Sequence, residues 1–401
     1  MASEAYSQLE KALRFSRELA GAVTRKIEEY WDLLTRASGA ERIKIMDFCG
    51  THEWTITYYG IRSVVPGGLE LVAGPGCPVC VTPSHYVEEL IRLALDGVVV
   101  YAYGDVYKLR AYRSVKGAYS LSDARSLGGD VRVVSDLLVA ARDAAKHGRP
   151  SVFAGIGFET VAPGYAQAIL RGHLPPNLKL LSLVKLTPPA MFYSLEVSRE
   201  KPTEPPIMGV IAPGHVSTIT GAKAWEPVSE NYKIPVVVSG FEPLDVLVSL
   251  LEILKMLVSG RAETVIEYKR SVSWHGDLSA QAAISKVFEI VDDAWRGVGF
   301  IPKSGLRLRE KYRIHDAFYE YGVKELAPGI WEKDMPPGCR CAEVVLGKAY
   351  PTQCPLFMKA CTPNRPIGPC MVSVEGTCAI WAKYGSRELL SKVSKVLRAA
   401  G

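Results

Sequence analysis

Nine cysteines are the residues of this 401-residue chain with the clearest capacity for chemistry. Cys49 stands alone, Cys77 and Cys80 form a C-x-x-C pair, and the other six crowd between Cys339 and Cys378. The N-terminus is polar and charged and has no apolar signal segment, so we expect a cytoplasmic protein. Thiols stay reduced in that compartment, and clustered cysteines there are more often metal ligands or redox groups than structural disulfides.

The C-terminal cysteines are the strongest chemical signal in the sequence. They are Cys339, Cys341, Cys354, Cys361, Cys370 and Cys378. Six thiols exceed the four that a tetrahedral zinc site or a [4Fe–4S] cluster requires, so a four-cysteine cluster with an adjacent dithiol fits the count. Zinc stays open as an alternative, although its usual paired C-x-x-C knuckles are missing. A secreted disulfide framework is disfavoured by the absence of a signal segment.

The two other cysteine motifs are less specific. Cys77-Pro-Val-Cys80 favours a redox dithiol, with half of a zinc site or two simply buried cysteines as alternatives. Cys49 precedes His52 and Glu53, which suggests a Cys/His nucleophile, but this spacing alone does not give the required geometry. A lone cysteine after a buried strand is by default a small packed hydrophobe.

Short apolar runs alternate with helical patterns between residues 40 and 300, and they must position these motifs. The runs are Ile43–Phe48, Leu69–Ala73, Val98–Ala102, Ser151–Ala154, Leu180–Leu186, Met208–Ala212 and Pro235–Ser239. The helical patterns include Tyr86–Leu95, Asp136–His147 and Leu244–Val258. Continuous β-branched runs of this kind are typical of parallel strands buried on both faces. We therefore predict an α/β protein with two parallel-sheet domains and a helix- and loop-rich C-terminal iron–sulfur domain.

The predicted domain boundaries follow changes in this pattern. We place α/β domain I at residues 40–149 and domain II at 150–300, with the break near His147–Pro150, where a helical pattern ends. The iron–sulfur domain covers 301–401, where Gly, Pro and Cys become frequent and bound metal would supply order. Residues 1–39 form an amphipathic helical segment, and the C-terminal domain is a candidate surface for its apolar face.

Unusual residues follow five of the predicted strands. They are Cys49, Cys77, Glu159, His215 and Glu242. Ligands of open parallel sheets bind beyond the carboxyl ends of the strands, so two facing domains would bring these side chains into one cleft. Taken singly, Glu159 and Glu242 are also explained as helix-capping or first-turn carboxylates, and His215 as a hydrogen-bonded loop histidine.

Composition excludes two classes of partner. The net charge of +6 is mild for this length and no basic block stands out, so nucleic acid is not expected. The longest apolar stretch, Leu244 to Val258, is interrupted by charged residues, so no membrane span is expected. No Walker-type sequence is present to indicate a bound nucleotide.

Taken together and in order, the motifs resemble those of the HypD family of [NiFe]-hydrogenase maturation factors, on which iron receives cyanide and carbon monoxide. The motifs are Cys49-Gly-Thr-His-Glu53, Gly74-Pro-Gly-Cys77-Pro-Val-Cys80, Gly157-Phe-Glu-Thr160, Gly214-His-Val-Ser217 and the segment from Cys339-Arg-Cys341 to Cys378. Each motif alone is weak, but the ordered set is specific. The resemblance runs from about residue 40 over nearly the whole chain.

The resemblance implies a [4Fe–4S] cluster and a neighbouring dithiol, an arrangement similar to the site of ferredoxin:thioredoxin reductase. The implied cluster ligands are Cys339, Cys354, Cys361 and Cys378. Cys341 and Cys370 would form the dithiol. Spacing by itself does not choose this set of four from six cysteines. Gln353 departs from the acidic residue expected beside Cys354.

The resemblance also implies partners and a transient iron. A HypC-type chaperone would share the iron with Cys49, and His215 would be a second candidate ligand from this chain. A HypE-type protein would present cyanide as an S-cyano group, and its transfer to iron formally takes two electrons. The implied electron relay runs from the cluster through the C-terminal dithiol to Cys77 and Cys80. The candidate catalytic residues are Cys49, Cys77, Cys80, Cys341, Cys370, His52, Glu53 and Glu159.

We therefore expect a metallocofactor assembly scaffold with redox activity rather than a conventional turnover enzyme. Two alternatives stay open, a stand-alone cluster-dependent thiol–disulfide oxidoreductase and a zinc-stabilised binding module. A reductase needs only its cluster and one dithiol, so substitution of Cys49 or His215 distinguishes it from the scaffold.

Overall fold

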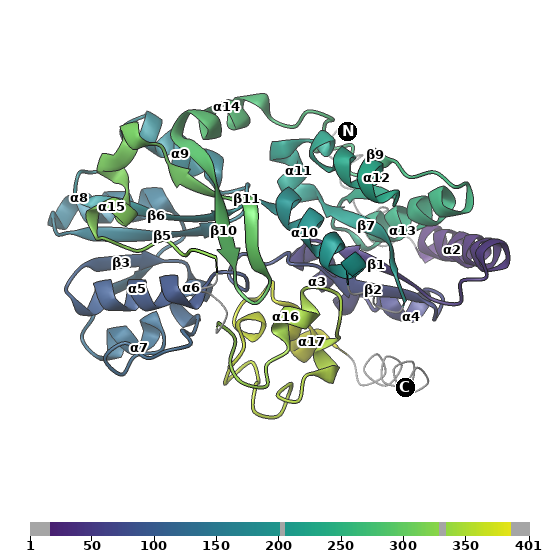
Figure 1. The fold of residues 1–401 in the computed structure, drawn as a ribbon, viewed down its shortest axis with the longest axis horizontal. Helices are drawn as coiled ribbons and strands as arrows, with labels where there is room; N and C mark the ends of the chain where they lie inside the picture. The colour runs from purple at the N-terminus through teal and green to yellow at the C-terminus, as the bar shows by residue number, and fades with distance from the viewer. Residues whose placement is uncertain (1–16, 201–204, 329–333, 386–401) are drawn as a thin grey trace, which may run out of the picture.

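Two β-sheets lie side by side, and the C-terminal region packs beneath the place where they meet (Figure 1). The computed structural model describes residues 17–200, 205–328 and 334–385. The prediction of an α/β protein with two mostly parallel sheets and a helix- and loop-rich, cysteine-containing C-terminal region is confirmed.

The first sheet has five strands, and all of them are parallel. In spatial order they are β2 (Leu69–Ala73), β1 (Ile43–Asp47), β7 (Ile207–Pro213), β8 (Val236–Ser239) and β9 (Thr264–Ile266). Every residue of β1, β2 and β8 is buried, as expected for strands that are covered on both faces. The apolar runs predicted for β1, β2, β7 and β8 are thus strands.

The second sheet has six strands, of which four pair in parallel and two form an antiparallel hairpin at one edge. In spatial order they are β10 (Phe288–Trp295), β11 (Gly299–Leu308), β6 (Leu178–Lys185), β5 (Ser151–Gly157), β3 (Val99–Ala102) and β4 (Val131–Val133). The antiparallel hairpin β10–β11 was not predicted, and strands extend to residue 308 instead of ending near 300. Strand β10 carries exposed and charged residues such as Glu289 and Asp292, so it lacks the continuous apolar pattern of the other strands.

The chain crosses between the sheets three times, which the local patterns do not reveal. Strands β1 and β2 belong to the first sheet, β3 to β6 to the second, β7 to β9 to the first and β10–β11 to the second. The predicted break near His147–Pro150 separates β4 from β5, which are both in the second sheet. Residues 40–149 and 150–300 therefore each contribute strands to both sheets. Periodicity identifies a strand, whereas its sheet is chosen by tertiary packing.

Helices fill the connections. They are α2 (Arg17–Ser38), α3 (Gly50–Tyr58), α4 (Ile61–Val64), α5 (Ser84–Leu95), α6 (Gly104–Lys108), α7 (Leu121–Ser126), α8 (Leu137–His147), α9 (Ala162–Leu170), α10 (Thr187–Glu200), α11 (Gly214–Thr220), α12 (Glu226–Tyr232), α13 (Pro243–Val258), α14 (Leu278–Val287) and α15 (Ala317–Glu320). The helical patterns predicted at α5, α8 and α13 are confirmed.

The N-terminal helix α2 packs on α13 rather than on the C-terminal region. Its buried residues Ile27, Trp31 and Leu34 share one apolar cluster with Leu247 and Leu250 of α13. Helix α13 is apolar on most of its surface, so it covers the first sheet and still offers a face to α2. Residues 1–16 of the predicted segment lie outside the described residues.

The C-terminal region contacts both sheets. Its α-helices are α16 (Cys341–Val344) and α17 (Thr377–Tyr384). Helix α17 packs against α3, which follows β1 of the first sheet. The turn of the β10–β11 hairpin reaches α16, since a Cβ added to Gly297 would lie 3.0 Å from the Ala342 side chain. The region therefore bridges the two α/β units.

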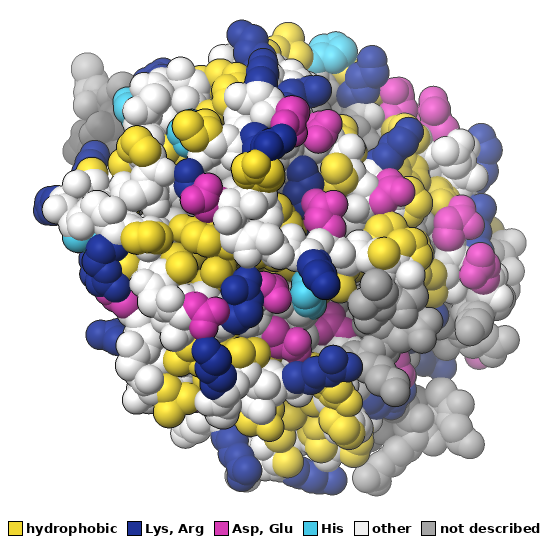
Figure 2. All heavy atoms as spheres, turned by 60° about the vertical axis from the view of Figure 1, so that its left-hand side comes forward, with side chains coloured by type: hydrophobic (Ala, Val, Ile, Leu, Met, Phe, Trp, Pro, Cys, Tyr) yellow, Lys and Arg dark blue, Asp and Glu magenta, His cyan; other side chains and the backbone are white. Residues whose placement is uncertain are grey.

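Two further observations concern the surface charge and the length of the helices. On the face drawn in Figure 2, Lys and Arg side chains are interspersed with Asp and Glu, so neither sign of charge dominates that face. Among the residues with described structure, no helix is both long and apolar enough to cross a bilayer.

Candidate thiol and metal site

Cys49 lies at the carboxyl end of β1, where the chain turns into α3. Its backbone is extended and precedes the first helical residue, Gly50. The loop after β2 packs directly against this turn, because a Cβ on Gly76 would lie 2.6 Å from the Cys49 nitrogen. Only glycine allows so close an approach of two backbones. The loop places Cys77 next to the Cys49 turn.

Cys77 and Cys80 are joined by a disulfide, which is the oxidised form of the predicted dithiol. Their exposed fractions are only 4% and 2%. The Cys80 backbone N–H also donates to Cys77 Sγ at 3.2 Å, so the C-x-x-C turn closes on itself. The Cys77–Cys80 pair is thus buried inside the protein.

One pocket contains Cys49 and the disulfide together. Its lining includes Asp47, Cys49, Cys77, Cys80, Glu375 and Thr377. Burial raises the pKa of the Cys49 thiol to about 12, and the Glu375 carboxylate acts in the same direction. The thiol form of Cys49 is therefore favoured in this pocket unless a nearby positive charge stabilises the thiolate.

Asp47 is a buried acid in this pocket that no motif had singled out. Its Oδ2 has no hydrogen-bond partner among the described residues. Burial, followed by the neighbouring Glu53 carboxylate, raises the pKa of Asp47 well above its usual range. The one available signal was an acidic residue near the end of the run Ile43–Phe48, which also contains Lys44.

Glu53, predicted as a catalytic residue, holds the C-terminal region in place. Its carboxylate accepts from Arg62 at 2.7 Å, from Thr57 at 3.0 Å and from the Trp381 indole N–H of α17 at 2.5 Å. The Arg62 guanidinium also lies over the Trp381 ring, 5.0 Å from its centroid. Glu53 lines the pocket, and these contacts fix α17 against α3.

His52 and His215 lie on Phe241, just after β8. The Phe241 ring stacks with His52 at 4.8 Å and with His215 at 3.8 Å between ring centroids. His52 Nε2 lies 2.9 Å from the Gly240 carbonyl oxygen, and burial lowers the pKa of His52 to about 4, so the ring is neutral. His215 does not line the pocket of Cys49. Glu242 caps α13 in a capping box with Asp245, which confirms the helix-cap interpretation.

Glu159 is separate from these residues because β5 belongs to the second sheet. Its buried carboxylate accepts from the Thr187 backbone N–H at 2.6 Å and from the Thr187 hydroxyl at 3.2 Å. Burial raises the pKa of Glu159 to about 7. Of the five residues expected beyond strand ends, four therefore follow strands of the first sheet, and Glu159 does not. The four are Cys49, Cys77, His215 and Glu242.

The C-terminal cysteines form a sulfur-rich cluster. Hydrogen bonds from the thiols of Cys341 and Cys378 lower the pKa of Cys370 to about 6. A Cβ on Gly368 would lie 2.6 Å from Cys339 Sγ and 2.8 Å from Cys341 Sγ, so both sulfurs face the Gly368 backbone. Cys378, an implied cluster ligand, thus contacts both members of the implied dithiol.

The two remaining implied ligands contact backbone groups. Cys361 Sγ accepts from the Ile367 backbone N–H at 3.3 Å, and Cys354 Sγ lies 3.9 Å from the Gly338 carbonyl oxygen. Within residues 17–200, 205–328 and 334–385, no three His, Cys, Asp or Glu side chains converge closely enough to hold a metal ion.

The chemistry of the donor set nevertheless fits a cysteine-ligated cluster. Five of the six thiols are buried, and Gly368 stands where a side chain would collide with two sulfurs. Hydrogen bonds from neighbouring thiols chiefly lower the pKa of Cys370, and the positive charge of the buried Arg296 guanidinium acts in the same direction, whereas the neighbouring Cys341 thiol and burial raise the pKa of Cys339. An anionic iron–sulfur cluster is stabilised by such a charge and by backbone N–H groups directed at sulfur.

The fold and the site define a class: a two-sheet α/β thiol protein in which a lone cysteine and a disulfide share a pocket with a cysteine-rich C-terminal region. The HypD family model, described as the hydrogenase formation hypA family, matches residues 21–385. The chain belongs to the HypD family.

Individual relatives agree with this assignment. The chain is 42% identical to the putative hydrogenase expression/formation protein of Methanocaldococcus jannaschii, over 87% of this chain and 94% of the relative. It is 37% identical to the hydrogenase maturation factor HypD of Cupriavidus necator, over 87% and 91% of the two chains. For the HypD of Rhodobacter capsulatus the identity is 38%, over 87% and 91%.

Proposed function

We propose that the protein is a cytoplasmic scaffold on which the iron centre of [NiFe]-hydrogenase receives cyanide and carbon monoxide. Iron is the cargo, held by Cys49 together with a cysteine of a HypC-type chaperone, and His215 is a second candidate ligand. The observation that carries the proposal is the pocket in which Cys49 meets the Cys77–Cys80 disulfide and residues of the C-terminal region. Thiolates are the soft, anionic donors that such iron requires.

The Cys77–Cys80 pair supplies the electrons for cyanide transfer. An S-cyano group on a HypE-type partner takes up two electrons and one proton to give a thiol and cyanide, which binds the iron. Oxidation of the two thiols of Cys77 and Cys80 to a disulfide releases two electrons and two protons, so one proton goes to solvent. A Cys77–Cys80 disulfide is the product that this donation would leave.

The C-terminal region is proposed to hold a [4Fe–4S] cluster on Cys339, Cys354, Cys361 and Cys378. When bound, such a cluster supplies electrons one at a time. Cys341 and Cys370 act as the neighbouring dithiol, and this choice rests on the family resemblance, because Cys378 interacts with both of them as well. The buried positive charge of Arg296 adds to the stabilisation of the Cys370 thiolate.

Infrared spectroscopy of the anaerobically purified complex with its HypC-type partner tests the scaffold. We expect bands of iron-bound cyanide and carbon monoxide that disappear in Cys49→Ala and weaken in His215→Ala. His173→Ala, which alters an exposed histidine, is the matched control and should keep the bands. Unchanged bands in Cys49→Ala would refute Cys49 as the iron ligand.

A second variant tests the electron supply. Cys77→Ala prevents the disulfide, so we expect cyanide to load onto iron much more slowly than in the unaltered protein. Loading at the unaltered rate would contradict a role for the Cys77–Cys80 pair in the transfer.

A stand-alone thiol–disulfide oxidoreductase is the second candidate, favoured by the Cys77–Cys80 disulfide. It predicts that Cys49→Ala retains full disulfide reductase activity. Metal analysis distinguishes both from a zinc module, because about four iron and four sulfide per chain are expected for one cluster.

A further inference from the structure

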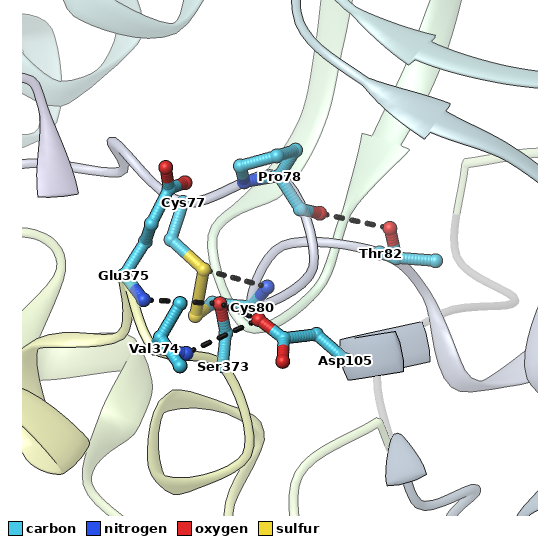
Figure 3. Close-up of a disulfide and its surroundings, with 8 residues drawn as sticks. All are labelled: Cys77, Pro78, Cys80, Thr82, Asp105, Ser373, Val374 and Glu375. Atoms are coloured by element: carbon cyan, nitrogen blue, oxygen red, sulfur yellow. Dashed lines mark hydrogen bonds between the residues drawn. A yellow bond between two sulfur atoms is a disulfide. The ribbon is translucent and has the colours of Figure 1, made fainter. Parts of the chain in front are cut away.

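A short segment of the C-terminal region, residues 373–376, lies against the Cys77–Cys80 disulfide, and we call it the strap. Asp105 of α6 holds it through two hydrogen bonds. The Asp105 carboxylate accepts from the Ser373 hydroxyl at 2.9 Å and from the Val374 backbone N–H at 3.1 Å (Figure 3). Asp105 follows β3 of the second sheet, whereas the disulfide follows β2 of the first. The strap therefore connects both α/β units at the disulfide.

The strap is also clamped on its other side. A Cβ added to Gly50 would lie 2.5 Å from the Glu375 carbonyl oxygen, so the strap backbone rests on the start of α3. A Cβ added to Gly376 would lie 2.2 Å from the Cys370 carbonyl oxygen. These contacts seat the middle of the strap in the pocket, where Glu375 lines the same wall as the disulfide.

We propose that Asp105 is a positioning residue, which keeps the strap closed over the pocket and so shields the Cys77–Cys80 disulfide from external thiols. Exchange requires a thiolate to reach a disulfide sulfur, and both sulfurs here are buried. An external thiol therefore reacts only when the strap lifts, and the two hydrogen bonds to Asp105 oppose that opening. This shielding goes beyond the scaffold function and does not require iron to be bound.

The reaction that reports on the strap is reduction by dithiothreitol. One of its thiolates attacks a sulfur of the disulfide, breaks the S–S bond and forms a mixed disulfide. Its second thiol then closes the ring of oxidised dithiothreitol. Two electrons and two protons pass to Cys77 and Cys80, which become free thiols. Quenching with an alkylating agent and mass spectrometry of the peptide that carries both cysteines gives the rate.

The test compares variants of the full-length, anaerobically purified protein. Asp105→Ala removes both hydrogen bonds, and we expect its disulfide to be reduced about tenfold faster or more. Ser373→Ala removes one of the two bonds to Asp105 and the bond that the Glu375 backbone N–H donates to the Ser373 hydroxyl at 3.2 Å within the strap, so it should also accelerate reduction. Asp105→Asn keeps a carbonyl oxygen that accepts both bonds, so it should restore most of the shielding. The Ser373 variant keeps the test valid if Asp105→Ala does not fold.

Asp136→Ala is the matched control. It removes the carboxylate that caps α8 by accepting from the Val139 backbone N–H at 2.9 Å, away from the strap. We expect a comparable loss of thermal stability and an unchanged reduction rate. Unaltered rates in the Asp105 and Ser373 variants would overturn the proposal, as would an equal acceleration in Asp136→Ala. Loss of the infrared bands in Cys49→Ala is independent of these rates, so failure of the strap and failure of the scaffold are distinguishable.

Discussion

Different interactions stabilise the two sheets and the cysteine-rich region 334–385. Strands β5 and β6 are buried along their whole length and pack against apolar helices on both faces. The cysteine-rich region has helices of only four and eight residues, and short turns fill the rest. Polar anchors at Glu53 and Asp105 attach it to the sheets.

This difference indicates that the sheets supply stability, whereas the cysteine-rich region is the part that can open. Apolar burial gives the sheets stability that does not depend on any single contact. The cysteine-rich region depends on a few hydrogen bonds, on close glycine contacts and on whatever its thiols bind. Regions that depend on few contacts open at lower free energy than the core, and sites that must exchange ligands or electrons are often built there.

Removal of bound metal should have the largest effect, and it should act on the cysteine-rich region but not on the sheets. Without a ligand for its thiols, the segment from Cys339 to Cys378 loses its main source of order. We expect its backbone amides to exchange with solvent about a hundredfold faster or more, while those of β5 and β6 are unchanged. Hydrogen exchange with mass spectrometry, before and after anaerobic chelation, measures both. Equal acceleration in the sheets would show that the regions are not independent.

Glu53→Ala should have the next largest effect. It leaves the buried Arg62 without its carboxylate and breaks the bond to Trp381, so we expect a loss of about 3–5 kcal/mol in the free energy of unfolding. Denaturant titration with hydrogen exchange of α17 measures the loss.

Glu343→Ala is the control for Glu53→Ala. It breaks a partly exposed ion pair with Arg340 in the same region, for which about 0–1 kcal/mol is expected. Similar losses in the two variants would argue against Glu53 as the principal anchor.

Glu159 should make the second sheet sensitive to pH. Its pKa of about 7 lies above that of an exposed glutamate, so the folded protein binds more protons than the unfolded chain between pH 4.5 and 7. The free energy of unfolding therefore falls as pH rises through this window, by about 3 kcal/mol. Urea titrations across the window should show a slope in the unaltered protein that is smaller by this amount in Glu159→Gln, because the raised pKa values of Glu267 and Asp47 leave a slope of their own. An undiminished slope in the variant would show that Glu159 does not contribute to it.

Two buried tryptophans, one in each region, allow the most direct comparison of the two regions, with the smallest expected effect on stability. The Trp381 indole donates to the Glu53 carboxylate, whereas Trp295 in the β10–β11 hairpin donates to the Ser304 hydroxyl at 2.9 Å. A hydrogen bond to a charged acceptor contributes more, so Trp381→Phe should cost about 2 kcal/mol and Trp295→Phe about 1 kcal/mol. Thermal or chemical denaturation measures both, and the reverse order would contradict the role of the charged anchor.

Local sequence patterns predicted most of the strands because both faces of the central strands are buried. The seven apolar runs all became strands, and the helix cap at Glu242 was recognised from its position. Strands β4 and β9, with three residues each, are too short to show a period. Asp105 was missed because a single acid after a strand gives no hint that a segment 268 positions away donates to it.

The sequence alone determined most of the strands, although not the β10–β11 hairpin, and it determined which thiols the protein carries, since burial periodicity and residue chemistry are local properties. Tertiary structure decided which strands share a sheet, and this choice placed Cys49 beside Cys77 and left Glu159 elsewhere. It also decided that Trp381 anchors on Glu53, 328 positions away in the chain. Contacts at such separations depend on how packed layers fit together, and no local pattern records that fit.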